Sequence, residues 1–343
     1  MPYVLKEQNI MIQFSDIQQA HRRIKPYIND TPIISSSLLN QWLGHEVYFK
    51  AECLQKIGAF KARGGCNAIQ VLLENHQDVN RVVANSSGNH AQAVAWAAAQ
   101  FNVQASIYMP SFASHVKAQA TRSYGAQVIQ FDTRQEVDAA VEHAAQDAGV
   151  YWIPPFNDDS VIAGQGTVVF EALKQLNQPI DAVFAPCGGG GLISGSLVAA
   201  KAMQPHVQVI AAEPLAGNDA MRSYLSGKIQ RLSEAPKTFA DGAMTLSIGE
   251  KTFAHIKHLD DFYAVSEEAM VYWTQWLQHL LKFHIEPTSA MTMDAVCQWL
   301  RKQNKPQKIL VVLSGGNIDT RMMQSIWAHD YLAETPNTDR FSD

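Results

Sequence analysis

The stretch Ala182-Val-Phe-Ala-Pro-Cys-Gly-Gly-Gly-Gly-Leu-Ile-Ser194 places four consecutive glycines between a short apolar run and an apolar segment of helical character. Four glycines in a row cost backbone entropy, so the chain must need their conformational freedom here. A strand, a glycine loop and the free N–H groups at the start of a helix form a cradle for an anion, above all a phosphate. A tight structural turn is the alternative interpretation.

The residues after the glycines argue against the two commonest nucleotide-binding loops. A P-loop ends in Gly-Lys-Ser/Thr, whereas Gly195 here is followed by Ser196 with no lysine. Leu192 and Ile193 break the spacing of the dinucleotide fingerprint GxGxxG. ATP and NAD are therefore poor candidates, and a phosphate monoester or a phosphorylated cofactor is a better one.

On both sides of the glycine loop, short apolar runs alternate with helical patterns, which is typical of βαβ units and a parallel sheet. The expected strands are Val47–Lys50, Arg81–Ala84, Ala105–Met109, Gln127–Phe131, Tyr151–Ile153, Ala182–Ala185, Val207–Ala211 and Lys308–Leu313. The expected helices are Phe14–Ile28, Gly64–Leu73, His90–Gln100, Ser114–Tyr124, Gln135–Gln146, Val161–Leu176, Leu192–Met203 and Glu267–Leu281.

Two more unusual loops follow predicted strands, Asn85-Ser-Ser-Gly-Asn-His90 and Ser314-Gly-Gly-Asn317. Ligands of open α/β sheets bind beyond the carboxyl ends of the strands, so the three loops predict one shared crevice. The hydroxyls, the amide and the free N–H groups of the first loop suit a carboxylate, although an ordinary helix cap would use the same residues. Ser314 alone would pass for a loop serine.

A lysine lies among small residues in Gly58-Ala-Phe-Lys-Ala-Arg-Gly-Gly65, at an expected helix start. A helix N-terminus disfavours a positive charge, and partial burial would lower the pKa of Lys61 further. A lysine with a lowered pKa can act as a Schiff-base amine. A surface lysine is the alternative.

Composition narrows the function classes. The chain has 343 residues, which suggests two lobes or one large α/β unit, and 47% of them are apolar, enough for a packed core. Its net charge of −5 gives no overall attraction for a phosphate backbone, so a nucleic-acid partner is not expected. No apolar run approaches the roughly 20 residues that span a bilayer, so no membrane association is expected either.

The cysteines and the N-terminus bear on the compartment. Cys53, Cys66, Cys187 and Cys297 form no CxxC pair and no zinc spacing. The first residues contain no apolar core of a secretory signal and no cleavage site. We therefore expect reduced thiols and a cytoplasmic location.

Taken together, the motifs resemble those of the fold-type II pyridoxal-phosphate (PLP) enzymes, and within them the branch of serine and threonine ammonia-lyases and serine racemase. The similarity runs from about Phe14 to about Asp319. The motifs that carry it are Phe60-Lys61…Arg63-Gly64, Ser86-Ser-Gly-Asn-His90, Ala163-Gly-Gln-Gly-Thr167, Gly188–Gly191, Ala212-Glu-Pro214, Ala240-Asp-Gly242, Ile285-Glu-Pro-Thr288 and Ser314-Gly-Gly-Asn317.

The resemblance implies a two-lobed α/β fold like that of tryptophan synthase β, with open, mostly parallel, twisted sheets and helices on both faces. Residues 1–53 and 156–343 would form a large PLP-binding domain, and residues 54–155 a small domain that carries the carboxylate loop. Closure of the lobes would exclude water from the reacting centre. A homodimer is implied as well.

The resemblance also implies site residues. Lys61 would hold PLP as a Schiff base and move the α-proton on one face, Asn89 would bond the ring 3′-oxygen, Phe60 would pack on the ring, and Ser314 would meet the pyridine nitrogen. Cofactor binding is implied for Phe60, Lys61, Asn89, Gly188, Gly189, Gly190, Gly191, Leu192 and Ser314. Substrate binding is implied for Ser86, Ser87, Asn89, His90 and Thr245.

Two positions bear on the choice within the branch. Ser87 stands where serine racemase has the acid/base of the face opposite the lysine, and two opposed proton carriers are what racemisation requires. Glu213 and Asp219, with the carbonyl of Gly217, match the divalent-cation site of that branch, which suits Mg²⁺, Ca²⁺ or Mn²⁺.

The neutral hydroxyl of Ser314 bears on the reaction, because a carboxylate there would hold the ring nitrogen protonated and deepen the electron sink. Without it, prompt loss of a β-leaving group is favoured. We therefore expect β-elimination from L-serine, L-threonine or a related β-hydroxy amino acid, giving a keto acid and ammonia. Serine racemisation, or dehydration or racemisation of 3-hydroxyaspartate, is the alternative for the same site, and one site could carry both activities.

Overall fold

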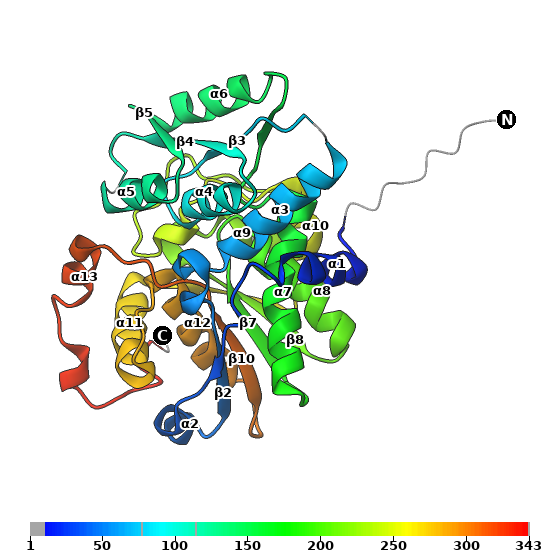
Figure 1. Cartoon of the computed structure of the whole chain (residues 1–343). Coiled ribbons are helices and arrows are strands. Elements are labelled where there is room, and N and C mark those ends of the chain that lie inside the picture. Colours follow the sequence, from blue (N-terminus) through cyan, green and yellow to red (C-terminus); the bar gives the residue numbers. More distant parts are fainter. Residues whose placement is uncertain (1–10, 77, 114, 342–343) are drawn as a thin grey trace.

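The computed structural model describes residues 11–76, 78–113 and 115–341, and it contains two separate open sheets (Figure 1). The larger sheet has the strand order β1-β2-β10-β7-β8-β9, and the smaller has the order β5-β4-β3-β6. Every pairing is parallel except that of β1 with β2. The larger sheet comprises β1 (Ile33–Ile34), β2 (Glu46–Ala51), β7 (Ala182–Pro186), β8 (Gln208–Pro214), β9 (Asp261–Val265) and β10 (Lys308–Leu313), and the smaller comprises β3 (Arg81–Asn85), β4 (Gln104–Pro110), β5 (Gln127–Phe131) and β6 (Val150–Trp152).

Helices connect the parallel strands and cover the sheets. The α-helices are α1 (Phe14–Ile24), α2 (Ser37–Leu43), α3 (Lys61–Asn75), α4 (Asn89–Gln100), α5 (His115–Ser123), α6 (Arg134–Ala144), α7 (Asp159–Leu176), α8 (Gly191–Met203), α9 (Asp219–Ser226), α10 (Glu250–Ile256), α11 (Glu267–Leu281), α12 (Pro287–Leu300) and α13 (Thr320–Ile326). Short 3-10 turns are η1 (Glu52–Leu54), η2 (Lys56–Gly58), η3 (Leu215–Gly217), η4 (Asp241–Ala243) and η5 (Tyr331–Ala333).

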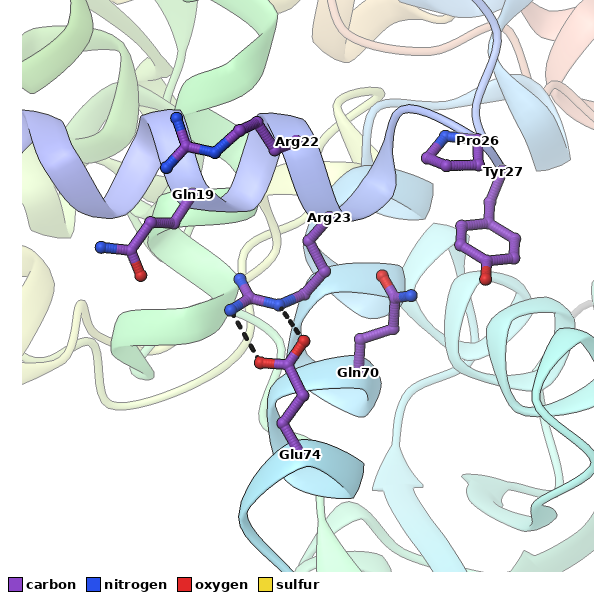
Figure 2. Close-up of a pocket in the computed structure, with 7 residues that line it drawn as sticks. All are labelled: Gln19, Arg22, Arg23, Pro26, Tyr27, Gln70 and Glu74. Atoms are coloured by element: carbon purple, nitrogen blue, oxygen red, sulfur yellow. Dashed lines mark hydrogen bonds and ion pairs between the residues drawn. The ribbon is translucent and has the colours of Figure 1, made fainter.

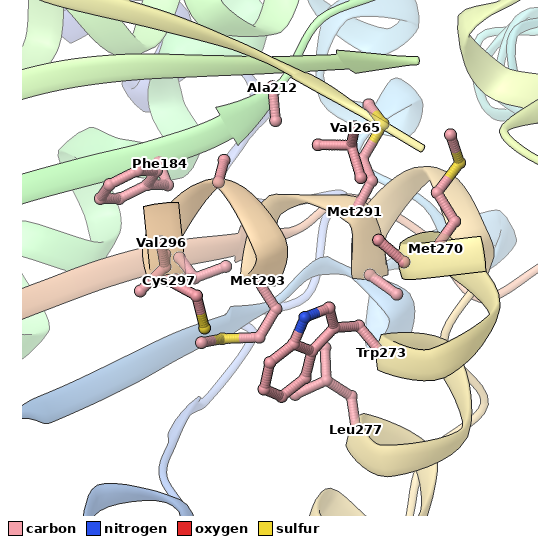
Figure 3. Packing of buried hydrophobic residues seen from close by; sticks show 14 of the residues in the cluster. Phe184, Ala212, Val265, Met270, Trp273, Leu277, Met291, Met293, Val296 and Cys297 are labelled. Carbon is pink, nitrogen blue, oxygen red and sulfur yellow. The ribbon is translucent and has the colours of Figure 1, made fainter. Parts of the chain in front are cut away.

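The larger sheet is buried on both faces. In β10, Ile309, Val311 and Leu313 pack into the cluster formed with α11 and α12, part of which Figure 3 shows. The alternate residues Leu310 and Val312 pack on the other side with residues of α7 and α8. Successive side chains of a strand point to opposite faces, so a strand covered on both sides reads as a continuous apolar run.

The smaller sheet follows the same rule. Val82 and Ala84 of β3 pack with apolar residues of α3, α4 and α5, and Val83 packs on the opposite face with Val137 and Val141 of α6. Helix α3 lies between the two units, since it contacts α4 on one side and α7 on the other. The α/β class with mostly parallel sheets is thereby confirmed.

All eight predicted strands and all eight predicted helices are present, with ends that differ by a few residues. Ser114, the predicted first residue of one helix, and residues 1–10, predicted to belong to the large domain, lie outside the described residues. The prediction that the first helix reaches Ile28 is wrong: α1 ends at Ile24. Pro26 explains this, because proline has no amide hydrogen and its ring clashes with the preceding turn.

Several elements were not predicted. Strands β1 and β9 are short edge strands, and α2, α9, α10, α12 and α13 were missed as well. Helix α12 is the instructive case, because every residue of it except Gln298 is buried. A helix that is apolar or buried all round has no amphipathic period by which its sequence could reveal it.

Candidate active site

The carboxyl ends of four strands carry the predicted site. Strand β2 leads through η1 and η2 to Lys61, β3 leads to the loop before α4, β7 leads to the glycines before α8, and β10 leads to Ser314. The parallel strands of a sheet end at one edge, so the topology of the larger sheet gathers the loops after β2, β7 and β10. The loop after β3 comes from the smaller sheet and meets them through the packing of the two units.

Backbone hydrogen bonds join the lysine segment to the serine loop. The N–H of Phe60 donates to the carbonyl of Ser314 at 2.9 Å, and the N–H of Gly316 donates to that of Gly58 at 3.0 Å. Residue 59 also forms an isolated antiparallel bridge with Gly315. The structure therefore holds the predicted Schiff-base lysine and the predicted partner of the ring nitrogen at fixed separation.

The amine of Lys61 is half-buried at the start of α3. Its Nζ donates to the carbonyl of Pro155 at 2.5 Å and lies 5.3 Å from the centre of the Phe60 ring. Burial lowers the pKa of Lys61 to about 8. A substantial fraction of the amine is then neutral near neutral pH, and a neutral amine is the nucleophile that forms a Schiff base.

A buried ionic network holds the start of α3 from behind. The guanidinium of Arg63, two residues after the lysine, donates to both oxygens of Glu52 at 2.7 and 2.8 Å and to Glu171 at 3.0 Å. Lys50 completes the network by donating to Glu171 at 2.6 Å. Two buried cations thus meet two buried carboxylates, and removing one partner would leave an uncompensated charge in the interior.

The glycine loop is closely packed on one side and uncapped on the other. A Cβ atom at Gly189 would lie 2.0 Å from a ring carbon of Phe156, and one at Gly188 would lie 2.9 Å from the carbonyl oxygen of Gly242. Gly190 has φ +89° and is the N-cap of α8, and no side chain caps the helix. The first amides of α8 therefore lack a side-chain acceptor, and this arrangement fits a phosphate group.

Ser314 is buried, and its hydroxyl is paired. Its Oγ lies 3.0 Å from Oγ of Ser289, which accepts the N–H of Gly315 at 2.8 Å and contacts the carbonyl of that residue at 2.9 Å. Ser289 was not predicted. Its hydroxyl orients that of Ser314, and a neutral hydroxyl is the group expected at the pyridine nitrogen.

The loop before α4 offers N–H groups of the kind a carboxylate needs. Gly88 is the N-cap of α4, no side chain caps the helix, and the first turn begins with Asn89 and His90. Oγ of Ser86 accepts the N–H of Gly88 at 3.2 Å. Ser87 is half-buried and forms no side-chain hydrogen bond to another described residue. The predicted binding of a substrate carboxylate by Ser86, Ser87, Asn89 and His90 stays a prediction.

His90 could reach a carboxylate through its backbone but not through its ring. Ring atom Nε2 lies 2.8 Å from the carbonyl of Ile153, so Nε2 carries the hydrogen, and Nδ1 is buried without a partner among the described residues. Burial, followed by the charge of Lys61, lowers the pKa of His90 to about 3. The ring is therefore neutral and has no second N–H to donate.

Asn89 belongs to a polar cluster that sequence reasoning missed in part. Its Nδ2 lies 3.2 Å from both carboxylate oxygens of Glu286, and its Oδ1 accepts from Asn317 at 2.8 Å. Burial, followed by the charge of Asp241, raises the pKa of Glu286 to about 7. The sequence signal that could have revealed this cluster is Glu286 itself. It is the acidic residue of the motif Ile285-Glu-Pro-Thr288 and precedes Pro287, the first residue of α12.

Thr245 is a predicted substrate residue whose side chain, like that of Ser87, forms no hydrogen bond to a described residue. Its hydroxyl is buried and has no hydrogen-bond partner among the described residues. No described contact joins it to Lys61 or to the carboxylate loop. Its predicted role stays a prediction.

The predicted cation ligands form a buried acidic pair. Glu213 is the next-to-last residue of β8 and accepts the N–H groups of Ala220 and Met221 at 3.1 and 2.9 Å, whereas both oxygens of Asp219 lack a partner among the described residues. Burial, followed by the charge of Asp219, raises the pKa of Glu213 well above its usual range, and burial raises that of Asp219 to about 7. Gly217 is also buried, two residues before Asp219.

A bound cation would neutralise the charge of the buried carboxylate pair Glu213 and Asp219. Within residues 11–76, 78–113 and 115–341, no group of three or more His, Cys, Asp or Glu side chains could hold a metal ion. A site here therefore needs backbone carbonyl and water oxygens as well as the two carboxylates, a donor set that suits Mg²⁺ or Ca²⁺. The orphaned carboxylate of Asp219 fits that requirement.

A surface groove between α1 and α3 is a separate feature (Figure 2). It contains none of the predicted site residues, and in it Arg23 pairs with Glu74 at 2.8 Å. Its lining residues are Gln19, Arg22, Arg23, Pro26, Tyr27, Gln70 and Glu74.

Comparison with known proteins agrees with this geometry. The family model for "Pyridoxal-phosphate dependent enzyme" matches residues 24–315. The L-threo-3-hydroxyaspartate ammonia-lyase of Saccharomyces cerevisiae is 41% identical over 315 residues, covering 91% of this chain and 95% of that protein. The serine racemase of Schizosaccharomyces pombe is 38% identical over 312 residues, covering 90% and 95%.

Solved structures extend the similarity to three dimensions. A threonine deaminase from T.th. matches with a TM-score of 0.85 and 40% identity, over 90% of this chain and 99% of that one. The family match spans the segment from α1 to the serine loop and includes Lys61, the glycine loop and Ser314. On this evidence the chain belongs to the family of pyridoxal-phosphate dependent enzymes.

Proposed function

We propose that the protein eliminates the β-hydroxyl group of L-serine, L-threonine or a related β-hydroxy amino acid and so releases a keto acid and ammonia. The observation that carries the proposal is the placement of Lys61, which has a lowered pKa and directly follows Phe60, whose N–H is bonded to the carbonyl of Ser314. The similarity to an ammonia-lyase and a threonine deaminase supports the same reaction class.

The residues have separate tasks in this proposal. The uncapped amides of α8 would hold the phosphate, the hydroxyl of Ser314 would meet the ring nitrogen, and the amides at the start of α4 would bind the substrate carboxylate. Bound PLP supplies an electron sink for the bond that breaks at Cα. Nζ of Lys61 would take the proton from Cα.

The reaction balances without an oxidant or a reductant. The proton of Cα and the hydroxyl of Cβ leave together as water, and one water is taken up again when the released enamine becomes keto acid and ammonia. The neutral hydroxyl at the ring nitrogen favours this prompt departure over a long-lived carbanion. Packing of α3 between the two units positions the lysine for the proton transfer.

Replacing the lysine tests the proposal. Lys61→Ala should lower turnover by roughly 10³-fold or more, because the nucleophile and the proton carrier are lost together. The assay is keto acid release by PLP-supplemented protein. Lys201→Ala removes a lysine that pairs with Asp260 elsewhere and is the matched control. Near-normal keto acid release from Lys61→Ala would remove the central assignment.

Racemisation is a second candidate because Ser87 lies in the carboxylate loop with its hydroxyl free of partners among the described residues. A hydroxyl on the face opposite Lys61 would give the second proton carrier that inversion at Cα needs. The similarity to serine racemase supports it. The same site would accept 3-hydroxyaspartate as a substrate for dehydration or racemisation.

The proposal also includes a divalent cation, a homodimer and a cytoplasmic location. Glu213, Asp219 and the carbonyl of Gly217 would hold Mg²⁺, or Ca²⁺ or Mn²⁺, beside the strand that precedes the glycine loop. The ion would neutralise the two buried carboxylates and stabilise the folded chain. All four thiols are unpaired, as is typical of a reducing compartment. Among the described helices, none is both long and apolar enough to cross a membrane.

A further inference from the structure

An ion pair joins the two sheet units at the candidate active site. Nζ of Lys117, on α5 beside the smaller sheet, donates to Oδ2 of Asp241 in η4, which belongs to the larger unit. The lysine side chain is 15% exposed and the aspartate 26%. A pair this sheltered is screened less by water and salt than an ordinary surface pair.

The pair borders the predicted cofactor and substrate groups. After Asp241, the chain continues into Gly242, whose carbonyl would lie 2.9 Å from a Cβ at Gly188. The pair also acts electrostatically on Glu286, the carboxyl that accepts from Asn89. Lys117 and Asp241 are therefore linked both to the phosphate cradle, through Gly242, and to the carboxylate loop, through Glu286.

Lys117 faces an excess of carboxylates. Burial lowers its pKa, but the charges of Asp241, Glu286 and Asp319 more than offset burial and leave the pKa above its usual value. Its ammonium group is therefore charged at neutral pH. By contrast, His90 is neutral, and Lys61 is assigned to PLP. A second anionic group on a substrate would bind to the ammonium group of Lys117.

We propose that Lys117 determines specificity by binding the β-carboxylate of a 3-hydroxy dicarboxylic amino acid, and that Asp241 occupies its ammonium group when such a substrate is absent. The inference rests on the proposed function, since it fixes the substrate class of the same site. In this proposal the substrate places its α-carboxylate at the start of α4 and its Cα at Lys61, and the β-carboxylate on Cβ replaces Asp241 at the ammonium group of Lys117. L-Serine and L-threonine carry no group there that could replace Asp241.

The test compares L-threo-3-hydroxyaspartate with L-serine on PLP-loaded wild type, Lys117→Gln and Asp241→Asn, with Lys201→Gln as the control for loss of a Lys–Asp pair. The readout is the ratio of the two kcat/KM values. Lys117→Gln should lower the ratio about 50-fold, since an unpaired carboxylate is costly in a sheltered site. Asp241→Asn should raise it several-fold, because a competing carboxylate is removed.

The opposite signs distinguish substrate binding from a structural link. If the pair only holds the two units together, both variants lower kcat/KM for both substrates and leave the ratio where it was, which overturns the proposal. A ratio that falls equally in Lys201→Gln overturns it too. If Lys117→Arg keeps the wild-type ratio of kcat/KM values, the result would support binding of the β-carboxylate through the positive charge at this position.

A binding measurement separates this inference from the proposed function. Succinate has the two carboxylates and the carbon chain of 3-hydroxyaspartate without its reacting groups. Calorimetry should show succinate binding that weakens at least tenfold in Lys117→Gln, while Lys201→Gln binds as wild type. Lys117-dependent binding by a chain that turns over neither substrate would refute the proposed function and keep this assignment. Equal binding by wild type and Lys117→Gln would refute the assignment.

Discussion

At the scale of single residues, the candidate site depends on which groups carry protons. Lys61 has a pKa lowered by burial, whereas His90 is held neutral by burial and by the charge of that lysine. The ring of His90 donates to the carbonyl of Ile153. In the proposed function the substrate carboxylate would therefore bind to backbone amides and hydroxyls, which keep their hydrogens near neutral pH.

His90 predicts a pH dependence of stability. The pKa of His90 is about 3 in the folded chain, below the ordinary 6.5. Between these pH values, the unfolded chain therefore binds a proton at His90 that the folded chain does not bind. The free energy of unfolding should therefore fall as pH drops from 6.5 toward 3, by up to about 1.4 kcal/mol per pH unit from this group. His90→Gln should flatten the slope, as measured by urea unfolding at several pH values. The exposed His206→Gln is the control, and equal slopes in all three proteins would contradict the account.

Ser87 predicts a difference between two activities. If its hydroxyl carries the proton of the second face, Ser87→Ala should reduce formation of the D-amino acid about 100-fold or more and keto acid release far less. Chiral chromatography and a keto acid assay on the same reaction measure both. Equal losses would show that Ser87 only positions the substrate.

At the scale of elements, the start of α8 joins the glycine loop to a helix and is the proposed phosphate site. Gly189→Ala should weaken PLP binding by about 10-fold or more, because the new Cβ meets the Phe156 ring and overpacking of this kind typically costs about 1–3 kcal/mol. Equilibrium titration of the apoprotein with PLP measures the loss. Gly44→Ala at the end of α2 is the control for general destabilisation, since its φ of +70° disfavours a side chain while an added Cβ there meets nothing within 4 Å. Unchanged PLP affinity in Gly189→Ala would place the phosphate elsewhere.

Local motifs explain how much of the site was predictable from the sequence. The glycine loop and Ser314 follow their strands closely, and Lys61 follows β2 after the two short turns η1 and η2, so their positions come from local patterns and from the topology of a parallel sheet. Asn89 and Glu286 are 197 residues apart, and Lys117 and Asp241 are 124 apart. No local pattern pairs such residues, because their meeting depends on how the two sheet units pack.

The helices and strands also divide into those that a local sequence pattern predicts and those that it does not. Amphipathic helices show a period, and strands covered on both faces read as continuous apolar runs; elements of both kinds were predicted. Helix α12 is buried at every position except Gln298, so it has no exposed polar face by which its sequence could reveal it. The edge strand β9 was missed, although the edge strands β5 and β6 were predicted. The orientation of Ser314 by Ser289 was missed because Ser289 lies on α12.

At the scale of the whole molecule, the buried acidic pair predicts a response to chelation. If Glu213 and Asp219 hold a cation, removing it should lower Tm by about 4 °C or more, since a ligand present at about 100 times its Kd contributes about 2.7 kcal/mol to the folded state. Differential scanning fluorimetry with EDTA, and then with added Mg²⁺, measures the change. Asp219→Asn should lose the response. If the Tm of metal-free protein does not change when Mg²⁺ or Ca²⁺ is added, the cation site is contradicted.

The account as a whole places one reacting centre between two sheet units, with the lysine on the helix that contacts both. The most direct test is a proton NMR time course in D₂O with PLP-loaded protein and Mg²⁺. Its substrates are L-serine, L-threonine and the two diastereomers of 3-hydroxyaspartate. The account predicts keto acid and ammonia in equal amounts from at least one of them. Deuterium at Cα of a D-amino acid, without keto acid, would make racemisation the main activity, and the absence of every product would contradict the proposed reaction.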